Sequence, residues 1–128
     1  MALSQSILGM NARNYLYIRK FNRRSHKLIA DDKLRTKQLL TTHNVPTPTL
    51  ISSFTKLKDA RSFAWDTLPR SFVIKPAHGY AGRGIIVISK WDGNYGRANK
   101  KNISVGMLES EIFGILDGAH SLNNLPDY

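Results

Sequence analysis

The chain has 128 residues, a hydrophobic content of 41% and a formal net charge of +10, with an isoelectric point near 10.2. This length fits one domain with a core of its own, and because there is no cysteine, a disulfide framework, a thiolate metal site and a cysteine nucleophile are excluded. The longest uninterrupted apolar run, residues 85–88, is far shorter than the ~20 residues of a membrane span, and the first ten residues lack the basic start of a signal peptide, so we expect a cytoplasmic protein.

The first part of the chain, residues 1–30, is predicted to be a basic helical segment, with short helices over residues 4–21 and breaks at Asn11 and Asn14. Residues 1–37 hold nine of the 19 Lys and Arg side chains but only two acids. Aromatic residues are interleaved with these cations, as in surfaces that stack bases and track phosphates. A basic nucleic-acid-binding module is therefore an alternative for the whole chain. No helix-turn-helix, zinc-finger or RNP pattern supports it. The other interpretations are recruitment to an anionic partner through this arm and, the one we favour, one cationic wall of a nucleotide cleft.

A helix is predicted next, capped by Asp31 or Asp32 and continuing to about His43. Asn44 can end it in the left-handed region, and the two prolines that follow require an extended exit. Lys33 falls in the first turn, where both the helix N-terminus and the lysine charge favour an anion. A capped surface helix with solvated lysines is the alternative interpretation.

Residues 72–88 are two strand-like runs around a glycine-rich loop, and Lys75 ends the first run. Gly79, Gly82 and Gly84 can bring backbone N–H groups close to an anion because they have no Cβ. A lysine at the mouth of such a loop is what a triphosphate needs. Walker A and Rossmann loops are excluded, since both lead into a helix and here a strand follows the glycines. An ordinary hairpin whose glycines serve only the turn remains the alternative.

The remaining elements predict an α+β domain with a small, largely antiparallel sheet. We expect a strand at residues 49–53, a helix from Lys56 to Trp65 capped by Thr55, strands at 71–75, 84–91 and about 100–103, and a turn at 92–96. Phe63 and Trp65 are expected to pack against the sheet. Ser104 is expected to cap a last helix that ends near Asp117. Its core-facing stripe, at i, i+4, i+7 and i+8, is Leu108, Ile112, Ile115 and Leu116, and Gly118 follows it.

Taken together, these segments resemble the ATP-grasp family along nearly the whole chain. The matching motifs are Asp32-Lys33, Thr36-Lys37, Val45-Pro46-Thr47-Pro48, Ile74-Lys75-Pro76 and the glycines from Gly79 to Gly84. Residues 7–15, Ile-Leu-Gly-Met-Asn-Ala-Arg-Asn-Tyr, look like the alpha-L-glutamate ligase-related (RimK-like) branch. The resemblance implies that residues 31–128 are the N-terminal, nucleotide-binding subdomain of an ATP-grasp fold.

The resemblance also implies a reaction: ATP phosphorylates a carboxylate to an acylphosphate, and an amine then forms an amide. The substrates would be small or peptide carboxylates and amines, with glutamate or another amino acid suggested by analogy. Lys33 and Lys75 would contact the α- and β-phosphates of ATP. A flap would close over the β- and γ-phosphates with its backbone N–H groups; it comprises His78, Gly79, Tyr80, Ala81, Gly82, Arg83 and Gly84. Arg83 would add charge there, or equally remain a solvated loop residue.

The catalytic residues and the ligands for Mg²⁺ are not found in the sequence. Its nine acids form no spaced Asp…Glu-x-Asn cluster, and its four histidines have no metal-ligand spacing. In ATP-grasp proteins these groups lie in a second half, downstream of the segments found here. We therefore expect this chain to be the N-terminal portion of a longer ligase, and to be inactive alone.

Overall fold

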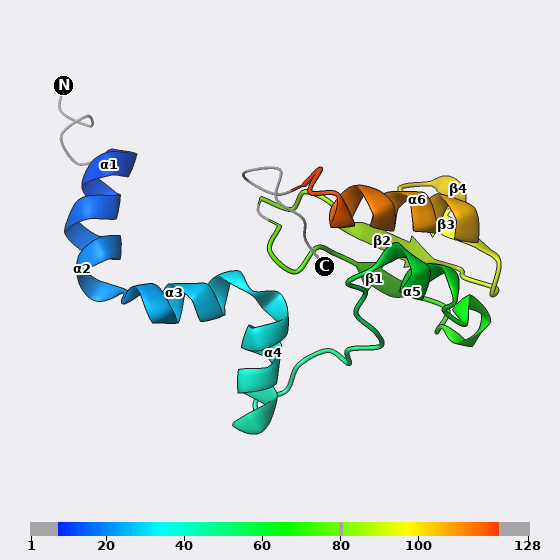
Figure 1. Cartoon of the computed structure of the whole chain (residues 1–128), viewed down its shortest axis with the longest axis horizontal. Coiled ribbons are helices and arrows are strands. Elements are labelled where there is room, and N and C mark those ends of the chain that lie inside the picture. Colours follow the sequence, from blue (N-terminus) through cyan, green and yellow to red (C-terminus); the bar gives the residue numbers. More distant parts are fainter. Residues whose placement is uncertain (1–7, 80, 121–128) are drawn as a thin grey trace. The chain divides into compact units, whose positions relative to one another are not determined.

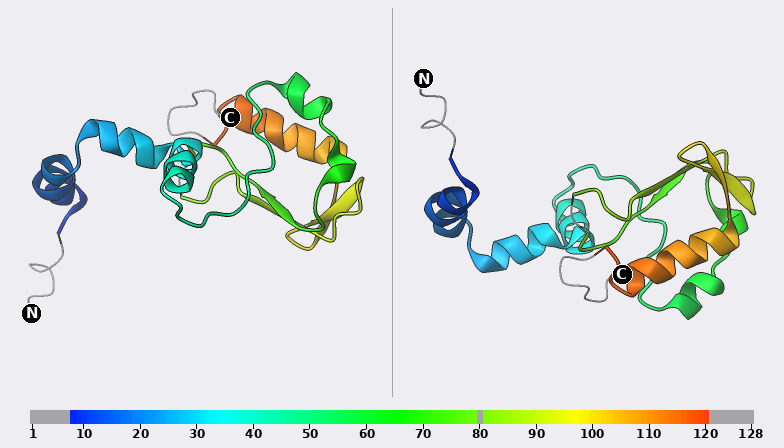
Figure 2. Two further views of the ribbon diagram at one scale, coloured as in Figure 1. Left: turned by 90° about the horizontal axis from the view of Figure 1, so that it is seen from below. Right: turned by 90° about the horizontal axis from the view of Figure 1, so that it is seen from above.

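The structure is a computed structural model that describes residues 8–79 and 81–120. The chain divides into two compact units, residues 1–47 and residues 48–128. The first unit is helical and the second contains the sheet (Figures 1 and 2). The predicted α+β class is confirmed.

The first unit begins with one continuous helical stretch from Met10 to Phe21 (Figure 1). It consists of α1 (Met10–Arg13), a π-helical turn η1 (Asn14–Ile18) and α2 (Arg19–Phe21). Asn11 and Asn14 lie inside this stretch, so the breaks predicted there are wrong. The chain continues through Asn14 because the turn widens to π-helical spacing instead of unwinding.

Two further helices, α3 (Arg24–Asp31) and α4 (Lys33–Thr42), complete the first unit. The predicted end of α4 is confirmed: Asn44 has φ of +56°, in the left-handed region. Its N–H donates to the carbonyl of Thr41 at 3.0 Å, and the N–H of Val45 donates to the carbonyl of Leu40 at 2.9 Å. These bonds satisfy carbonyl groups that the end of the helix leaves without intrahelical partners.

The second unit contains a four-stranded antiparallel sheet in the order β1-β2-β3-β4. Its strands are β1 (Phe72–Ile74), β2 (Ile86–Ser89), β3 (Tyr95–Ala98) and β4 (Lys101–Ser104). The predicted antiparallel sheet is therefore confirmed. The predicted turn is shorter than expected, because Asp92 Oδ1 accepts from the N–H groups of Asn94 (2.9 Å) and Tyr95 (2.8 Å) and closes it early. These two bonds also lower the pKa of Asp92.

Two expectations for the segment before the sheet are wrong. Residues 49–53 form no strand, since a strand requires a neighbour to complete its ladder and none pairs with them. The helix predicted from Lys56 to Trp65 is only α5 (Leu57–Arg61), and a 3₁₀ turn, η2 (Trp65–Thr67), follows. Lys56 takes the N-cap position, with no side-chain cap, and Thr55 does not. The helix stops early because the chain bends to bring the rings of Phe63 and Trp65 together, 5.2 Å apart, at the core.

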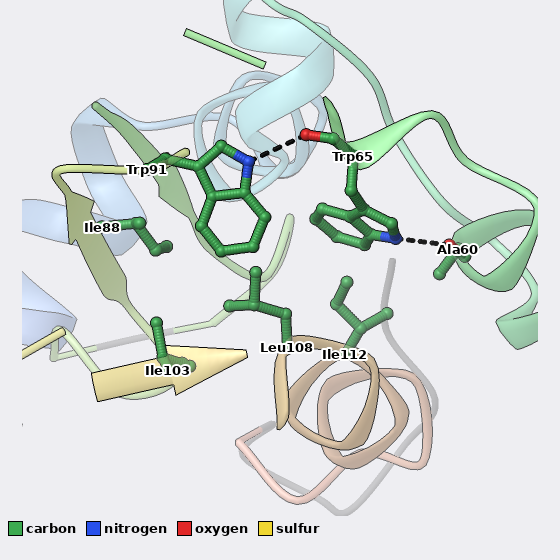
Figure 3. Close-up of a cluster of buried hydrophobic side chains, with 7 residues drawn as sticks. All are labelled: Ala60, Trp65, Ile88, Trp91, Ile103, Leu108 and Ile112. Carbon is green, nitrogen blue, oxygen red and sulfur yellow. Dashed lines mark hydrogen bonds between the residues drawn. The ribbon is translucent and has the colours of Figure 1, made fainter. Parts of the chain in front are cut away.

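The core is centred on two indoles, Trp65 and Trp91, between the sheet and α6 (Val105–Leu116). Trp91 Nε1 donates to the carbonyl of Trp65 at 2.8 Å, and Trp65 Nε1 donates to the carbonyl of Ala60 at 3.1 Å. Figure 3 shows Leu108 and Ile112 projecting from α6 towards both rings. Each indole therefore buries its ring without leaving its N–H group unpaired.

The last helix follows its prediction closely. Ser104 Oγ accepts from the N–H of Met107 at 3.4 Å, and the stripe of Leu108, Ile112 and Ile115 is buried. Gly118 follows α6 with φ of +85°, a left-handed conformation that suits glycine at a helix end. In Figures 1 and 2 the helix lies across one face of the sheet.

We expect Leu108→Ala to lower the free energy of unfolding by about 2–5 kcal/mol, because Leu108 is completely buried and the cavity cannot fully collapse. Urea denaturation measures this. Met107→Ala is the matched control: that side chain is 52% exposed on the same helix, so its effect should stay within about 0.5 kcal/mol. Equal losses for the two variants would contradict this view of the core.

Candidate functional site

The glycine-rich loop between β1 and β2, residues 75–85, has a tightly packed base. Pro76 and Ala77 are buried there. A Cβ added to Gly79 would overlap the ring of Pro76 and lie 3.4 Å from the carbonyl oxygen of Arg83. Glycine is therefore required at position 79 because the two limbs of the loop approach each other closely.

The tip of the same loop is open. Ala81 and Gly82 have φ of +52° and +75°, and both are exposed, as is Arg83. No heavy atom of the described residues outside its chain neighbours lies within 4 Å of a Cβ built on Gly82. Of the predicted loop residues, Tyr80 lies outside the described residues. A fixed base with an exposed tip is the geometry of a loop that can contact a ligand through its backbone.

At the end of the loop, Gly84 packs against His120, a residue that the sequence did not indicate as part of this site. It has φ of +71°, and a Cβ at this position would lie 2.8 Å from Cδ2 of His120 and 3.1 Å from Cγ of Pro76. His120 follows α6, so the helix that builds the core also brings an imidazole beneath the loop. The two residues are 36 positions apart in the chain, so no local sequence pattern predicted this contact.

Lys75 and an apolar pair share the open face of the sheet. Lys75 is exposed and directly follows Ile74, so the alternation of side chains along the strand places it on the same face as Val73. Val73 is paired with Val87 across the β1–β2 ladder, and these side chains are 52% and 56% exposed. This face thus offers a flat apolar surface beside a cation.

A shallow hollow of about 480 Å³ continues this face towards β3. It is lined by Val87, Ser89, Lys90, Arg97, Asn99 and Lys100. Arg97 Nη2 donates to the carbonyl of Lys100 at 3.2 Å, which holds the guanidinium over the β3–β4 turn. Every charged residue of this lining is a cation. The sequence indicated these three basic residues only as general charge, since their grouping depends on the register of β2 with β3.

The start of α4, in the first unit, differs electrostatically from the expectation. Asp32 is 4% exposed, and its Oδ1 accepts from the N–H groups of Leu34 (2.9 Å) and Arg35 (3.0 Å). Its Oδ2 lies 3.2 Å from Arg35 Nε. The carboxylate of Asp32 therefore already takes the place of an anion at this helix N-terminus, contrary to the expectation that the terminus itself favours a ligand. The ammonium group of Lys33 remains the candidate contact.

The structure thus brings Lys75 and the predicted residues His78, Gly79, Ala81, Gly82, Arg83 and Gly84 together in one loop, while Lys33 belongs to the other unit. Among residues 8–79 and 81–120, no three His, Asp or Glu side chains group closely enough to hold a metal ion. Mg²⁺ therefore has no ligand set in this part of the chain. None of the helices formed by these residues combines the length and the apolar character that a membrane crossing needs.

The second unit is thus an antiparallel sheet that carries a glycine-rich hairpin with a lysine at its mouth. A family model for sugar-transfer associated ATP-grasp proteins matches residues 12–128, and the chain belongs to this family. The predicted superfamily is thereby confirmed.

Two curated relatives are D-alanine–D-alanine ligases. The chain is 38% identical over 69 residues to the ligase of Sphingopyxis alaskensis and 36% identical over 69 residues to that of Novosphingobium aromaticivorans. Each match covers 54% of this chain but only 21% and 20% of the two relatives, so the match spans about a fifth of their length. No solved structure matches the chain.

The loop base predicts a difference between two glycines. Gly84→Ala should lower the free energy of unfolding by about 2–4 kcal/mol, because the new methyl group meets His120 and Pro76 in a left-handed conformation. Gly82→Ala should cost only about 1 kcal/mol, since it has the same backbone strain but open space around it. Urea denaturation of both variants measures the difference, and a larger loss for Gly82→Ala would refute the packed base.

The capping of α4 predicts a second difference. Asp32→Ala should destabilise the start of the helix by about 1 kcal/mol, because two N–H groups lose their acceptor. Amide hydrogen exchange at Leu34 and Arg35 should then become faster. Asp31→Ala, which removes an exposed carboxylate one residue earlier, is the control and should leave both rates nearly unchanged. Similar acceleration in the two variants would mean that charge, and not the cap, protects these amides.

Proposed function

We propose that this chain is the ATP-binding portion of an ATP-dependent carboxylate–amine ligase that works through an acylphosphate and forms an amide bond. The observation that carries the proposal is the loop with a packed base and an open tip, next to Lys75 and the exposed Val73–Val87 pair. A triphosphate needs backbone N–H groups and a cation, and a purine base needs a flat apolar surface. Membership of an ATP-grasp family supports the same assignment.

The proposed contacts are those that the resemblance to ATP-grasp proteins implies. Lys75 and Lys33 each contact the α- and β-phosphates, Lys33 through its ammonium group alone. The loop from His78 to Gly84 covers the β- and γ-phosphates. The cations of the hollow, such as Arg97, add positive potential to the same face. Phosphoryl transfer requires mainly positioning and neutralisation of charge, which these groups supply.

Mg²⁺ belongs to this proposal as the partner of ATP, but the described donors do not fit its octahedral oxygen shell. No step is therefore assigned to it, and no catalytic residue is assigned in this chain. We expect the chain alone to bind the nucleotide without turning it over. A cytoplasmic location, where ATP is supplied, is part of the same proposal.

The substrates are proposed only as a class: a carboxylate, activated by ATP, and an amine. Two relatives are named D-alanine–D-alanine ligases, which favours amino-acid substrates. Residues 7–15 favour the alpha-L-glutamate ligase-related branch and hence glutamate, whereas the family description points to an association with sugar transfer. No pocket among the described residues favours one of these substrates over the others.

The test is a backbone amide NMR titration with ATP. We expect shifts in the loop from Lys75 to Gly84, and we expect Lys75→Ala to weaken binding at least about tenfold because a charge-assisted phosphate contact is lost. Lys33→Ala should weaken it independently. Lys58→Ala, which removes an exposed cation of α5, is the control and should leave the affinity unchanged.

A different distribution of shifts would favour the alternative. Shifts spread over residues 13–27 that fade as salt rises, with no change in the loop, would indicate a nucleic-acid-binding surface instead of a nucleotide site. If Lys75→Ala and Lys58→Ala weaken ATP binding equally, the affinity depends only on the net charge of the chain.

A further inference from the structure

The helical arm formed by residues 10–31 is not used by the proposed nucleotide site. Residues 1–30 contain no Asp or Glu, and the arm has a single acid, Asp31, at its end. Its cations are Arg13, Arg19, Lys20, Arg23, Arg24 and Lys27. An excess of this kind on a helix attracts an anionic surface from a distance.

The arm also carries an apolar stripe. The stripe consists of Met10, Tyr17, Ile18 and Phe21, and Tyr17 and Phe21 are neighbours on it about one turn apart. Met10 is 72% exposed and Phe21 is 68% exposed, and the rings of Tyr17 and Phe21 are 6.4 Å apart. None of residues 10–31 is buried. The stripe therefore has no packing partner among the residues described.

The cations of the same stretch lie next to its aromatic rings. Arg19 Cζ is 5.9 Å from the centre of the Tyr15 ring, and Lys20 Nζ is 5.3 Å from the centre of the Phe21 ring. Exposed aromatic and aliphatic side chains together with Lys and Arg on one helix are found in segments that lie in the plane of a membrane interface. Aromatic rings at this level place an apolar body and a polar edge at the boundary.

We propose that the arm binds the surface of an anionic lipid bilayer, with the Met10–Phe21 stripe inserted at the headgroup boundary and the cations against the headgroups. Exposed aliphatic side chains, Met10 and Leu28 (53%), have a place in a bilayer but none in base stacking. The positive charge complements anionic headgroups.

The test is co-sedimentation of the full chain with vesicles of phosphatidylcholine alone and of phosphatidylcholine with about one-third phosphatidylglycerol. We expect binding only to the anionic vesicles, weakened by raising salt from about 0.1 M to about 1 M. The double variant Arg19→Glu/Lys20→Glu should weaken it at least about tenfold. Tyr17→Ser/Phe21→Ser, which leaves the charge unchanged, should weaken it at least about threefold.

The control is Lys56→Glu/Lys58→Glu, an identical change of charge at exposed positions of the second unit, and it should bind vesicles like the unchanged chain. Three outcomes would overturn the proposal. These are no binding to anionic vesicles, equal losses for the arm and control charge variants, or full binding by Tyr17→Ser/Phe21→Ser together with tighter binding to a single-stranded oligonucleotide. The last result would assign the arm to nucleic acid. Circular dichroism of each variant confirms that the arm is still helical.

Discussion

The hydrogen bond from the Trp91 indole to the carbonyl of Trp65 is the contact on which the second unit depends. It joins the segment before the sheet to the end of β2 and allows both rings to be buried under α6 (Figure 3). Without an acceptor, the Trp91 N–H group would be costly to bury. Gly96 makes the arrangement fit, because a Cβ there would lie 2.8 Å from the Trp91 ring. The core thus lies on one face of the sheet, and Val73 and Val87 are exposed on the other.

The glycine loop depends on the same core. β1 and β2 are held in register with their ends at Ile74 and Ile86, and the loop spans the distance between these ends. The helix α6 closes over the core and ends at Leu116, and the turn that follows it brings His120 against Gly84. The loop base is thus packed against His120, whereas a Cβ built on Gly82 at the tip would meet no heavy atom of the described residues within 4 Å. This contrast suits a flap, whose base must be fixed and whose tip must move over a ligand.

The two units differ in how much of their apolar surface they bury. The second buries a core, whereas residues 10–31 of the first expose both their charges and their apolar stripe. A short helix gains little stability from propensity alone and needs a surface to cover its apolar side. At α4 the arrangement is the opposite, because the buried carboxylate of Asp32 accepts hydrogen bonds from the N–H groups of the first helical turn.

Local chemistry in the sequence was enough to predict several features: the Ser104 cap and the stripe of α6, the left-handed Asn44, the antiparallel strands and the glycine loop with Lys75. Each depends on spacing, side-chain branching or a preference of φ within a few residues. Only tertiary structure decided that residues 49–53 pair with no strand, that α5 stops at Arg61, and that His120 lies under Gly84. These outcomes depend on ladder partners and ring packing between segments far apart in the chain. A sequence pattern shows what a segment can bury or bond, but the partner that completes it exists only after folding.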